Sequence, residues 1–166
     1  MQKAICLVGF MGSGKTTIGG ALGKLTHYHW IDLDHFIEKE EKDSIANIFA
    51  KNGEAYFRDL ENRYLKKVLS QKPVIISTGG GIILKEENRH LLKEQSTFYL
   101  SYEFDTLYHR IAGDRKRPLV TSYDEVKERF NMRRSLYEEA SRIKIECEGK
   151  KVQQIVEEIQ SYLSIT

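Results

Sequence analysis

The sequence predicts an α/β fold in which helices cover both faces of a parallel sheet. Five short apolar runs alternate with stretches whose apolar residues recur at helical spacing, a pattern typical of parallel sheets. The first run leads directly into a glycine-rich loop of the form G-x-x-x-x-G-K-[ST], which binds phosphate when it joins a strand to a helix. The expected strands are residues 4–8, 28–31, 74–77, 98–100 and 143–147.

The helices are expected between and after these strands, where apolar residues recur three or four positions apart. Ser44 and Gly53 have the residue types that begin and end a short helix. Ser122 and Glu125 match a capping box, which predicts the start of a later helix. The other expected helices are residues 16–25, 54–69, 86–93, 105–111, 123–139 and 151–163.

Composition predicts a single domain over residues 1–166, because no repeat, low-complexity stretch or linker divides the chain. The formal net charge of +2 comes from 26 basic and 24 acidic residues, which is too balanced to predict nucleic acid or membrane as a partner. No apolar stretch has membrane-spanning length, and no signal peptide is visible. Cys6 and Cys147 are expected to be buried thiols, as in a reduced cytoplasmic compartment. No surplus apolar face indicates more than a monomer.

The loop at residues 9–16 predicts a site for nucleotide phosphates. Its glycines permit backbone conformations closed to other residues, so the amides of residues 12–17 can surround an anion at a helix N-terminus. Lys15 would contact the β- and γ-phosphates and Thr16 would offer its hydroxyl to Mg²⁺. The alternative is a glycine-rich turn with a solvated lysine. The predicted phosphate-binding residues are Gly12, Ser13, Gly14, Lys15, Thr16 and Thr17.

Two carboxylates, Asp32 and Asp34, follow the second expected strand. If the chain is still extended there, their spacing points both to one side, where they can serve a metal ion and a hydroxyl-bearing substrate. The alternative is that one of them caps a helix that starts near His35.

Arg58 and Glu61 are three residues apart and can form a pair on one helix face. Phe49 and Phe57 could line the floor of a pocket beneath Arg58, which would bind a small carboxylate bidentately. Spacing alone favours the alternative, a surface ion pair over ordinary core aromatics.

Three glycines, Gly79, Gly80 and Gly81, follow the third expected strand. We expect them to serve not packing but the close approach of a ligand to backbone amides; the alternative is a plain tight turn.

A basic loop with one glycine and one proline predicts a mobile lid at about residues 112–122. The alternative is a solvated run of charges. One of Arg133 and Arg134 should face the site, and periodicity does not decide which.

Together these residues closely resemble the shikimate kinase family over nearly the whole chain. The phosphate loop is shared with many kinases, whereas the Phe-Arg-x-x-Glu block, the triple glycine and the Arg-Pro-Leu motif are far more specific. The motifs are residues 9–17, Asp32-x-Asp34, residues 45–49, Gly53-Glu54-x-x-Phe57-Arg58-x-x-Glu61, residues 79–81, Arg117-Pro118-Leu119 and Arg133-x-x-Leu136-Tyr137.

The resemblance implies a sheet order of 2-3-1-4-5 and transfer of the γ-phosphate of ATP to the 3-hydroxyl of shikimate, with Mg²⁺. Asp34 would bind ring hydroxyls, and Arg58 and Arg133 would bind the carboxylate. The implied substrate region is about residues 33–61. The implied substrate-binding residues are Asp34, Arg58, Gly79, Gly80, Gly81, Arg133, Glu61, Phe49 and Phe57.

For the phosphates and the nucleotide, the resemblance implies that Thr16 and Asp32 serve Mg²⁺, Asp32 through water. Lys15 and the lid residue Arg117 would stabilise the transferring phosphoryl group, and Arg110 would flank adenine. Lys15, Asp34 and Arg117 would thus be catalytic.

Two departures from the family pattern matter: Ser135 stands where proline is common, and residues 146–150 are shorter than the usual adenine-contacting loop. The rival functions are another small-molecule kinase of this fold, for gluconate or a nucleoside monophosphate, and a nucleotide-dependent binding switch.

Overall fold

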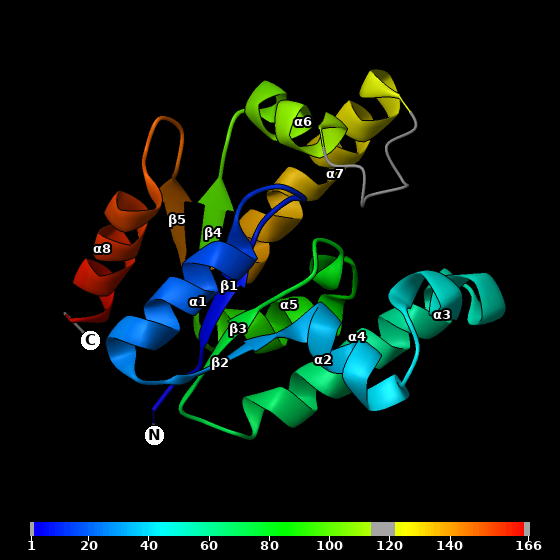
Figure 1. The fold of residues 1–166 in the computed structure, drawn as a ribbon, viewed down its shortest axis with the longest axis horizontal. Helices are drawn as coiled ribbons and strands as arrows, with labels where there is room; N and C mark the ends of the chain where they lie inside the picture. The colour runs from blue at the N-terminus through cyan, green and yellow to red at the C-terminus, as the bar shows by residue number, and fades with distance from the viewer. Residues whose placement is uncertain (1, 114–121, 165–166) are drawn as a thin grey trace.

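The computed structural model describes residues 2–113 and 122–164. Its strands form one parallel sheet in the order β2-β3-β1-β4-β5, as expected (Figure 1). Only β3 has the predicted bounds; the other strands differ by one or two residues at an end. The strands are β1 (Ile5–Val8), β2 (His29–Asp32), β3 (Val74–Ser77), β4 (Ser96–Ser101) and β5 (Ile143–Glu146).

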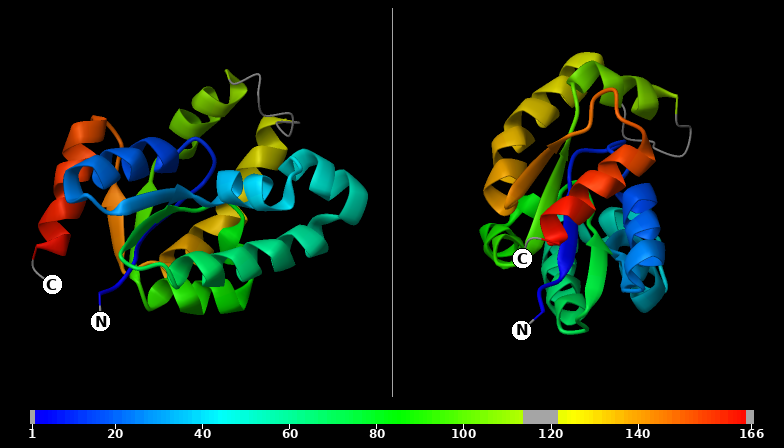
Figure 2. Two further views of the ribbon diagram at one scale, coloured as in Figure 1. Left: turned by 60° about the horizontal axis from the view of Figure 1, so that its bottom comes forward. Right: turned by 90° about the vertical axis from the view of Figure 1, so that its left-hand side faces the viewer.

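Helices cover both faces of the sheet. α1 (Lys15–Thr26) and α8 (Val152–Leu163) lie together on one face, and α4 (Glu54–Leu69), α5 (Glu86–Lys93) and α7 (Tyr123–Ala140) lie on the other (Figure 2). α2 (Leu33–Glu41) and α3 (Ile45–Asn52) extend from the β2 edge beside α4. The short 3-10 helix η1 (Ile82–Leu84) precedes α5, and α6 (Phe104–Ala112) follows β4.

The caps explain several of these boundaries. Ser44 accepts a hydrogen bond from the Asn47 amide at the start of α3, and Ser122 accepts one from the Glu125 amide at the start of α7, both as predicted. Gly53 ends α3 and begins α4 with a φ of 85°, a conformation that favours glycine.

The core lies on the central strands. Every residue of β1 and β3 is buried, because helices cover both faces and leave no side of these strands to solvent. Cys6 and Cys147 are buried, unpaired thiols, as expected, and burial raises the pKa of each to about 12. Within the described ranges, no helix is both long and apolar enough to cross a membrane.

Trp30 on β2 connects helix α1 to the sheet through hydrogen bonds and close packing. Its indole N–H donates to the Ser77 hydroxyl at 3.0 Å, and that hydroxyl donates to the Lys15 carbonyl at 2.7 Å. A Cβ on Gly19 would lie 2.9 Å from the indole Cδ1 atom, so a glycine there lets the helix approach the ring. These contacts hold the first turn of α1 at the carboxyl ends of β2 and β3.

Candidate active site

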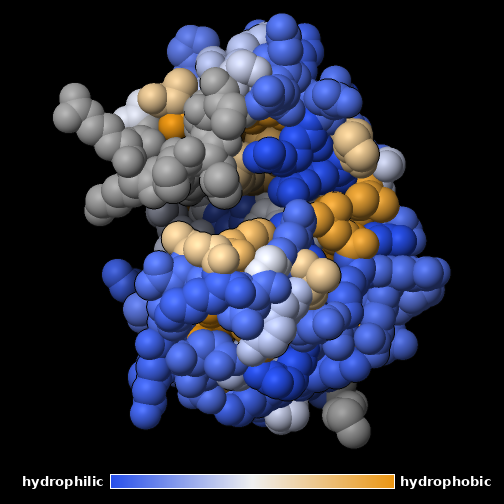
Figure 3. Space-filling model, turned by 90° about the vertical axis from the view of Figure 1, so that its right-hand side faces the viewer, coloured by the Kyte–Doolittle hydropathy of each residue, from blue (hydrophilic) through white to orange (hydrophobic). Residues whose placement is uncertain are grey.

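A cavity of about 570 Å³ lies at the carboxyl end of the sheet, between the phosphate loop, the start of α2, α4 and α7. Hydrophilic side chains cover most of the molecular face seen from the side of α3 (Figure 3). The predicted residues that line the cavity are Gly12, Gly14, Lys15, Thr16, Thr17, Asp32, Asp34, Phe49, Phe57, Arg58, Glu61, Gly79, Gly80, Gly81 and Arg133.

The phosphate loop has the geometry of an anion site. Gly12 and Gly14 have φ values of 81° and 84°, which side chains with a Cβ rarely adopt. No side chain caps the N-terminus of α1, so its first amides and the helix dipole face the cavity. Lys15 Nζ donates to the carbonyls of Gly9 at 2.6 Å and Phe10 at 3.0 Å. Ser13 is buried beneath the loop at 1% exposure and does not line the cavity.

Asp32 and Thr16 meet beside this loop. The Thr16 hydroxyl donates to Asp32 Oδ2 at 2.7 Å, and Asp32 Oδ1 accepts from the His35 amide at 3.1 Å. Asp32 is therefore the N-cap of α2. The chain is not extended through Asp34, because α2 begins at Leu33, and the alternative that one of the two carboxylates caps a helix is confirmed for Asp32. Both carboxylates line the cavity all the same.

This pair fits Mg²⁺. One hydroxyl and one carboxylate beside a phosphate site match an ion that keeps several waters and binds through a carboxylate and phosphate oxygens. In the described part of the chain, no three His, Cys, Asp or Glu side chains cluster as ligands, so the fit depends on the nucleotide to complete the shell.

Asp34 lines the cavity and lies against the glycine loop. A Cβ on Gly79 would come 2.6 Å from Asp34 Oδ1. Burial, and secondly the charge of Asp32, raise the pKa of Asp34 to about 6, against the opposing charges of Lys15 and Arg58. A carboxyl with this pKa is ionised at neutral pH and can still take up a proton.

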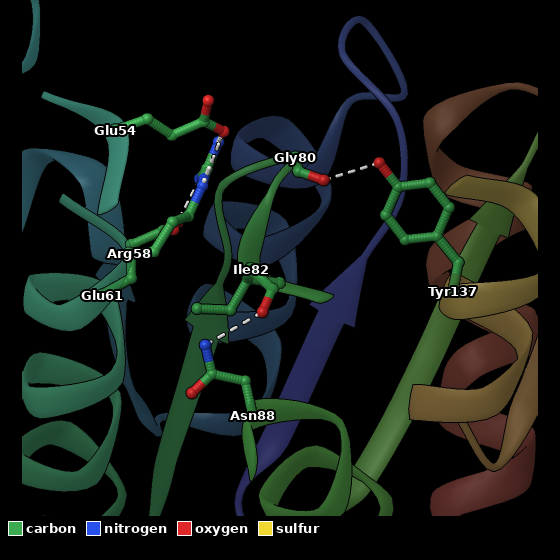
Figure 4. Close-up of polar contacts among 7 residues, drawn as sticks. All are labelled: Glu54, Arg58, Glu61, Gly80, Ile82, Asn88 and Tyr137. Atoms are coloured by element: carbon green, nitrogen blue, oxygen red, sulfur yellow. Dashed lines mark hydrogen bonds and ion pairs between the residues drawn. The ribbon is translucent and has the colours of Figure 1, made fainter. Parts of the chain in front are cut away.

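Arg58 lines the cavity from α4. Its Nη1 donates to Glu61 Oε1 at 2.6 Å and its Nη2 to Glu54 Oε1 at 3.3 Å (Figure 4). The guanidinium lies 5.9 Å from the ring centroid of Phe49 and 5.4 Å from that of Phe57. The surface-pair alternative is wrong, because the side chains of Arg58 and Glu61 are only 15% and 1% exposed.

Glu61 is a buried carboxylate that fixes this arginine. Burial raises the pKa of Glu61 to about 7, although the charge and hydrogen bond of Arg58 oppose the rise. Because two carboxylates and two aromatic rings constrain Arg58, its guanidinium is held in a defined position in the cavity.

The triple glycine lets charged side chains of the cavity lie close to the backbone of residues 79–81. None of Gly79, Gly80 and Gly81 has a positive φ. Instead, a Cβ at residue 81 would lie 2.6 Å from Arg58 Cζ, and one at residue 80 would lie 3.8 Å from Arg133 Nη1. The expectation that these glycines do not serve packing is therefore wrong for Gly79 and Gly81.

Two buried side chains hold the glycine loop from below and from the side. Tyr137 donates its hydroxyl to the Gly80 carbonyl at 2.6 Å, and Asn88 donates to the Ile82 carbonyl at 3.0 Å (Figure 4). Tyr137 is fully buried and stacks on Tyr99 with ring centroids 5.3 Å apart. The loop is thus fixed against both α5 and α7.

The structure decides between the two arginines of α7. Arg133 lines the cavity, and its burial lowers the pKa of its guanidinium. Arg134 is exposed, with its guanidinium 5.6 Å from the ring centroid of Phe130.

Arg110, which was expected to flank adenine, does not line the cavity. Its guanidinium donates to the Gly12 carbonyl at 2.9 Å and lies 4.5 Å from the ring centroid of Tyr102. Arg117, like residues 114–121 of the expected lid, lies outside the described residues.

Four cavity residues were not predicted as site residues: Met11, Ile45, Thr78 and Arg129. The four-residue spacing between Arg129 and Arg133 could have indicated Arg129, because residues one helical turn apart share a helix face. Met11 is a variable position of the phosphate loop, and no spacing rule marks Ile45 or Thr78.

Comparisons with known proteins agree with this geometry. The family model described as "Shikimate kinase" matches residues 11–164. A shikimate kinase of Persephonella marina is 44% identical over 95% of this chain and 97% of its own. One from Bacillus cereus is 42% identical over 98% of this chain and 99% of its own.

Solved structures show the same likeness. A shikimate kinase from Acinetobacter baumannii in complex with shikimate has a TM-score of 0.92 at 33% identity, covering 100% of this chain and 96% of its own. One from Aquifex aeolicus has a TM-score of 0.87 at 37% identity, covering 97% and 96%. A gluconokinase from Sinorhizobium meliloti, with a TM-score of 0.61 at 15% identity over 98% of this chain and 92% of its own, shares the fold alone. The chain therefore belongs to the shikimate kinase family, ATP-dependent enzymes that phosphorylate shikimate.

Proposed function

We propose that the described residues divide this reaction, ATP plus shikimate to 3-phosphoshikimate plus ADP, between two ends of one cavity. The observation that carries the proposal is that the two ends differ in chemistry. Backbone amides and Lys15 belong to the phosphate loop, whereas Arg58 and Arg133 lie against the glycine loop, and Asp34 is subject to the charges of both Lys15 and Arg58. The first end suits a triphosphate and the second a carboxylate.

At the acceptor end, Arg58 and Arg133 bind the carboxylate of shikimate, and the rings of Phe49 and Phe57 support Arg58 from beneath. Glu61 holds Arg58 in place. Asp34 accepts a hydrogen bond from the attacking 3-hydroxyl and is a proton acceptor at neutral pH, since its pKa is about 6. A substrate held at both ends is oriented for in-line attack on the γ-phosphorus.

At the donor end, the amides of residues 12–17 and Lys15 bind the phosphates of ATP. Lys15 stabilises the charge that develops on the transferring phosphoryl oxygens. Thr16 would ligate Mg²⁺ directly and Asp32 through water, and the bound ion would neutralise phosphate charge. Arg110, which already touches the outer side of the loop at Gly12, flanks the adenine. Arg117 is proposed to reach the phosphoryl group from the lid.

The test is ADP release coupled to a spectrophotometric readout, with purified protein, ATP, Mg²⁺ and a panel of acceptors. Shikimate should support turnover far above the background of ATP hydrolysis, whereas gluconate and nucleoside monophosphates should not. Another acceptor that supports turnover as fast as shikimate would contradict the assignment. Hydrolysis of ATP that occurs only when a protein partner is added would contradict it as well. Mass spectrometry of the product identifies the phosphorylated hydroxyl.

We also propose that the chain acts as a monomer in the cytoplasm, as one domain. Sedimentation at assay concentrations tests the monomer, and fractionation of the source cells tests the compartment.

A further inference from the structure

Arg129 is a cavity cation that the roles proposed above leave unused. It lies on α7, is half-buried and lines the cavity together with Met11 and Gly12 of the phosphate loop. It precedes Arg133 by one helical turn, so both side chains project from the same face of α7. The two guanidiniums are close enough that the charge of Arg129 lowers the pKa of Arg133, although less than burial does.

The position of this turn of α7 is fixed by aromatic packing. Phe130 meets Phe10 of the phosphate loop edge-to-face, with ring centroids 5.4 Å apart. Arg133, one turn further along, faces Gly80 in the acceptor half. Arg129 therefore stands about 6 Å along the helix from Arg133, on the side of the phosphate loop. This is the border between the donor and acceptor halves of the cavity.

Arg129 also differs in its partners from the other two arginines that line the cavity. Arg58 is paired with Glu54 and Glu61, and Arg133 contacts Tyr137. Within residues 2–113 and 122–164, no side chain or carbonyl forms a hydrogen bond or ion pair with Arg129. Its donors face a cavity in which phosphoryl oxygens pass from ATP to the acceptor.

We propose that Arg129 binds the transferring phosphoryl group from the acceptor side and thereby recognises the phosphorylated product. This inference rests on the proposed function and names a residue that it does not use. A guanidinium can hold two phosphoryl oxygens bidentately, while Lys15 serves the same group from the donor side. Arg129 thus discriminates 3-phosphoshikimate from shikimate, since only the product carries the group that it binds.

The test compares Arg129→Gln with Arg134→Gln by calorimetric titration of shikimate and of 3-phosphoshikimate. The control removes the same charge from the adjacent, exposed position of the same helix. Arg129→Gln should weaken binding of the product by about tenfold or more, and that of shikimate by less than about twofold. Turnover should fall about 10- to 100-fold. Arg134→Gln should change neither affinity, and Arg129→Lys should restore part of the product affinity.

Other results overturn the inference. Equal weakening of both ligands would place Arg129 at the carboxylate end, and unchanged product affinity would remove it from phosphoryl recognition. Thermal melting checks that each variant is folded, and Arg129→Lys provides the comparison if Arg129→Gln is not. If the unaltered protein binds neither compound, the proposed function fails, which is a different result from failure of the Arg129 assignment.

Discussion

Gly81 lies directly against the guanidinium of Arg58. A Cβ at residue 81 would come 2.6 Å from Arg58 Cζ, although the two residues belong to different elements, the loop after β3 and helix α4. The arginine is thus enclosed by Glu61 and Glu54 along its own helix and by a bare backbone opposite. The position of Arg58 in the cavity depends on the absence of a side chain at residue 81.

Gly81→Ala should therefore displace Arg58 and raise the KM for shikimate about tenfold or more, because about 1.4 kcal/mol of binding corresponds to a factor of ten. The KM for ATP should change little, since the phosphate loop is not touched. Gly80→Ala should have a smaller effect, because its Cβ would meet its neighbours at 3.7 Å or more. Steady-state kinetics measures both. Gly20→Ala, with its nearest atom at 3.8 Å, is the control, and equal KM values for all three variants would refute the steric argument.

Arg58→Ala should weaken shikimate binding roughly 100-fold, since truncating one partner of a buried charge pair costs about 2–5 kcal/mol. The turnover at saturating shikimate should fall less, because the arginine binds a group remote from the reacting hydroxyl. Arg63→Ala is a matched control on the same helix, because Arg63 is 65% exposed and pairs with Glu41 at the surface. Unchanged shikimate affinity in Arg58→Ala would exclude the carboxylate clamp.

Asp34 should set the acid limb of the pH profile. With a pKa of about 6, it is protonated below that pH and no longer accepts the hydroxyl hydrogen bond. Values of kcat/KM should fall as pH drops through about 6. Asp34→Asn should abolish most activity, whereas Asp59→Asn, at an exposed carboxylate, should retain both activity and profile. An acid limb that stays flat to pH 5 would contradict this role for Asp34.

The same carboxyl should make stability depend on pH. The folded chain holds the Asp34 proton up to about pH 6, whereas the unfolded chain releases it near 3.8. The folded state binds more protons in this window, so the free energy of unfolding falls as pH rises through it. Asp34→Asn has no carboxyl at this position, so its free energy of unfolding lacks this pH dependence. The difference in free energy of unfolding between the variant and the unaltered protein should therefore shift by about 2–3 kcal/mol in favour of the variant from pH 4 to pH 7. Urea unfolding at both pH values measures the difference, and an equal stability difference at the two would contradict the prediction.

Lys15→Ala should reduce kcat by about 100- to 1,000-fold, because it removes a cation from the transferring phosphoryl group. Lys15 also bonds the carbonyls of Gly9 and Phe10, so melting curves must show that the loop variant is folded. Lys24→Ala, exposed near the end of the same helix, is the control. Near-normal turnover in Lys15→Ala would exclude Lys15 from catalysis.

The fold followed from the sequence because its signals are local. Continuous apolar runs marked the central strands, and α4 and α5 have the predicted bounds because their apolar spacing and flanking residues agree. The phosphate loop is contiguous in sequence, so its glycines, Lys15 and Thr16 could be placed together from the motif alone. The sheet order required the resemblance, because strand pairing joins segments distant in the chain.

The rest of the site depends on contacts that spacing does not encode. The chain turns into α2 directly after Asp32, and the sequence pattern left open whether the strand continued to Asp34 or one of the two carboxylates capped a helix. The partners of Gly79 and Gly81 lie on α2 and α4, so a sequence cannot show what their missing side chains make room for. Arg133 and Arg134 are adjacent on a helix with a weakly apolar face, and only packing against Phe130 and the glycine loop separates them.

The most direct measurement is a crystal structure of the chain with shikimate, ADP and Mg²⁺. We expect the carboxylate of shikimate between Arg58 and Arg133, its 3-hydroxyl at Asp34, and the phosphates of ADP on the amides of residues 12–17. Shikimate bound away from Arg58, or a nucleotide bound away from the first turn of α1, would contradict the account.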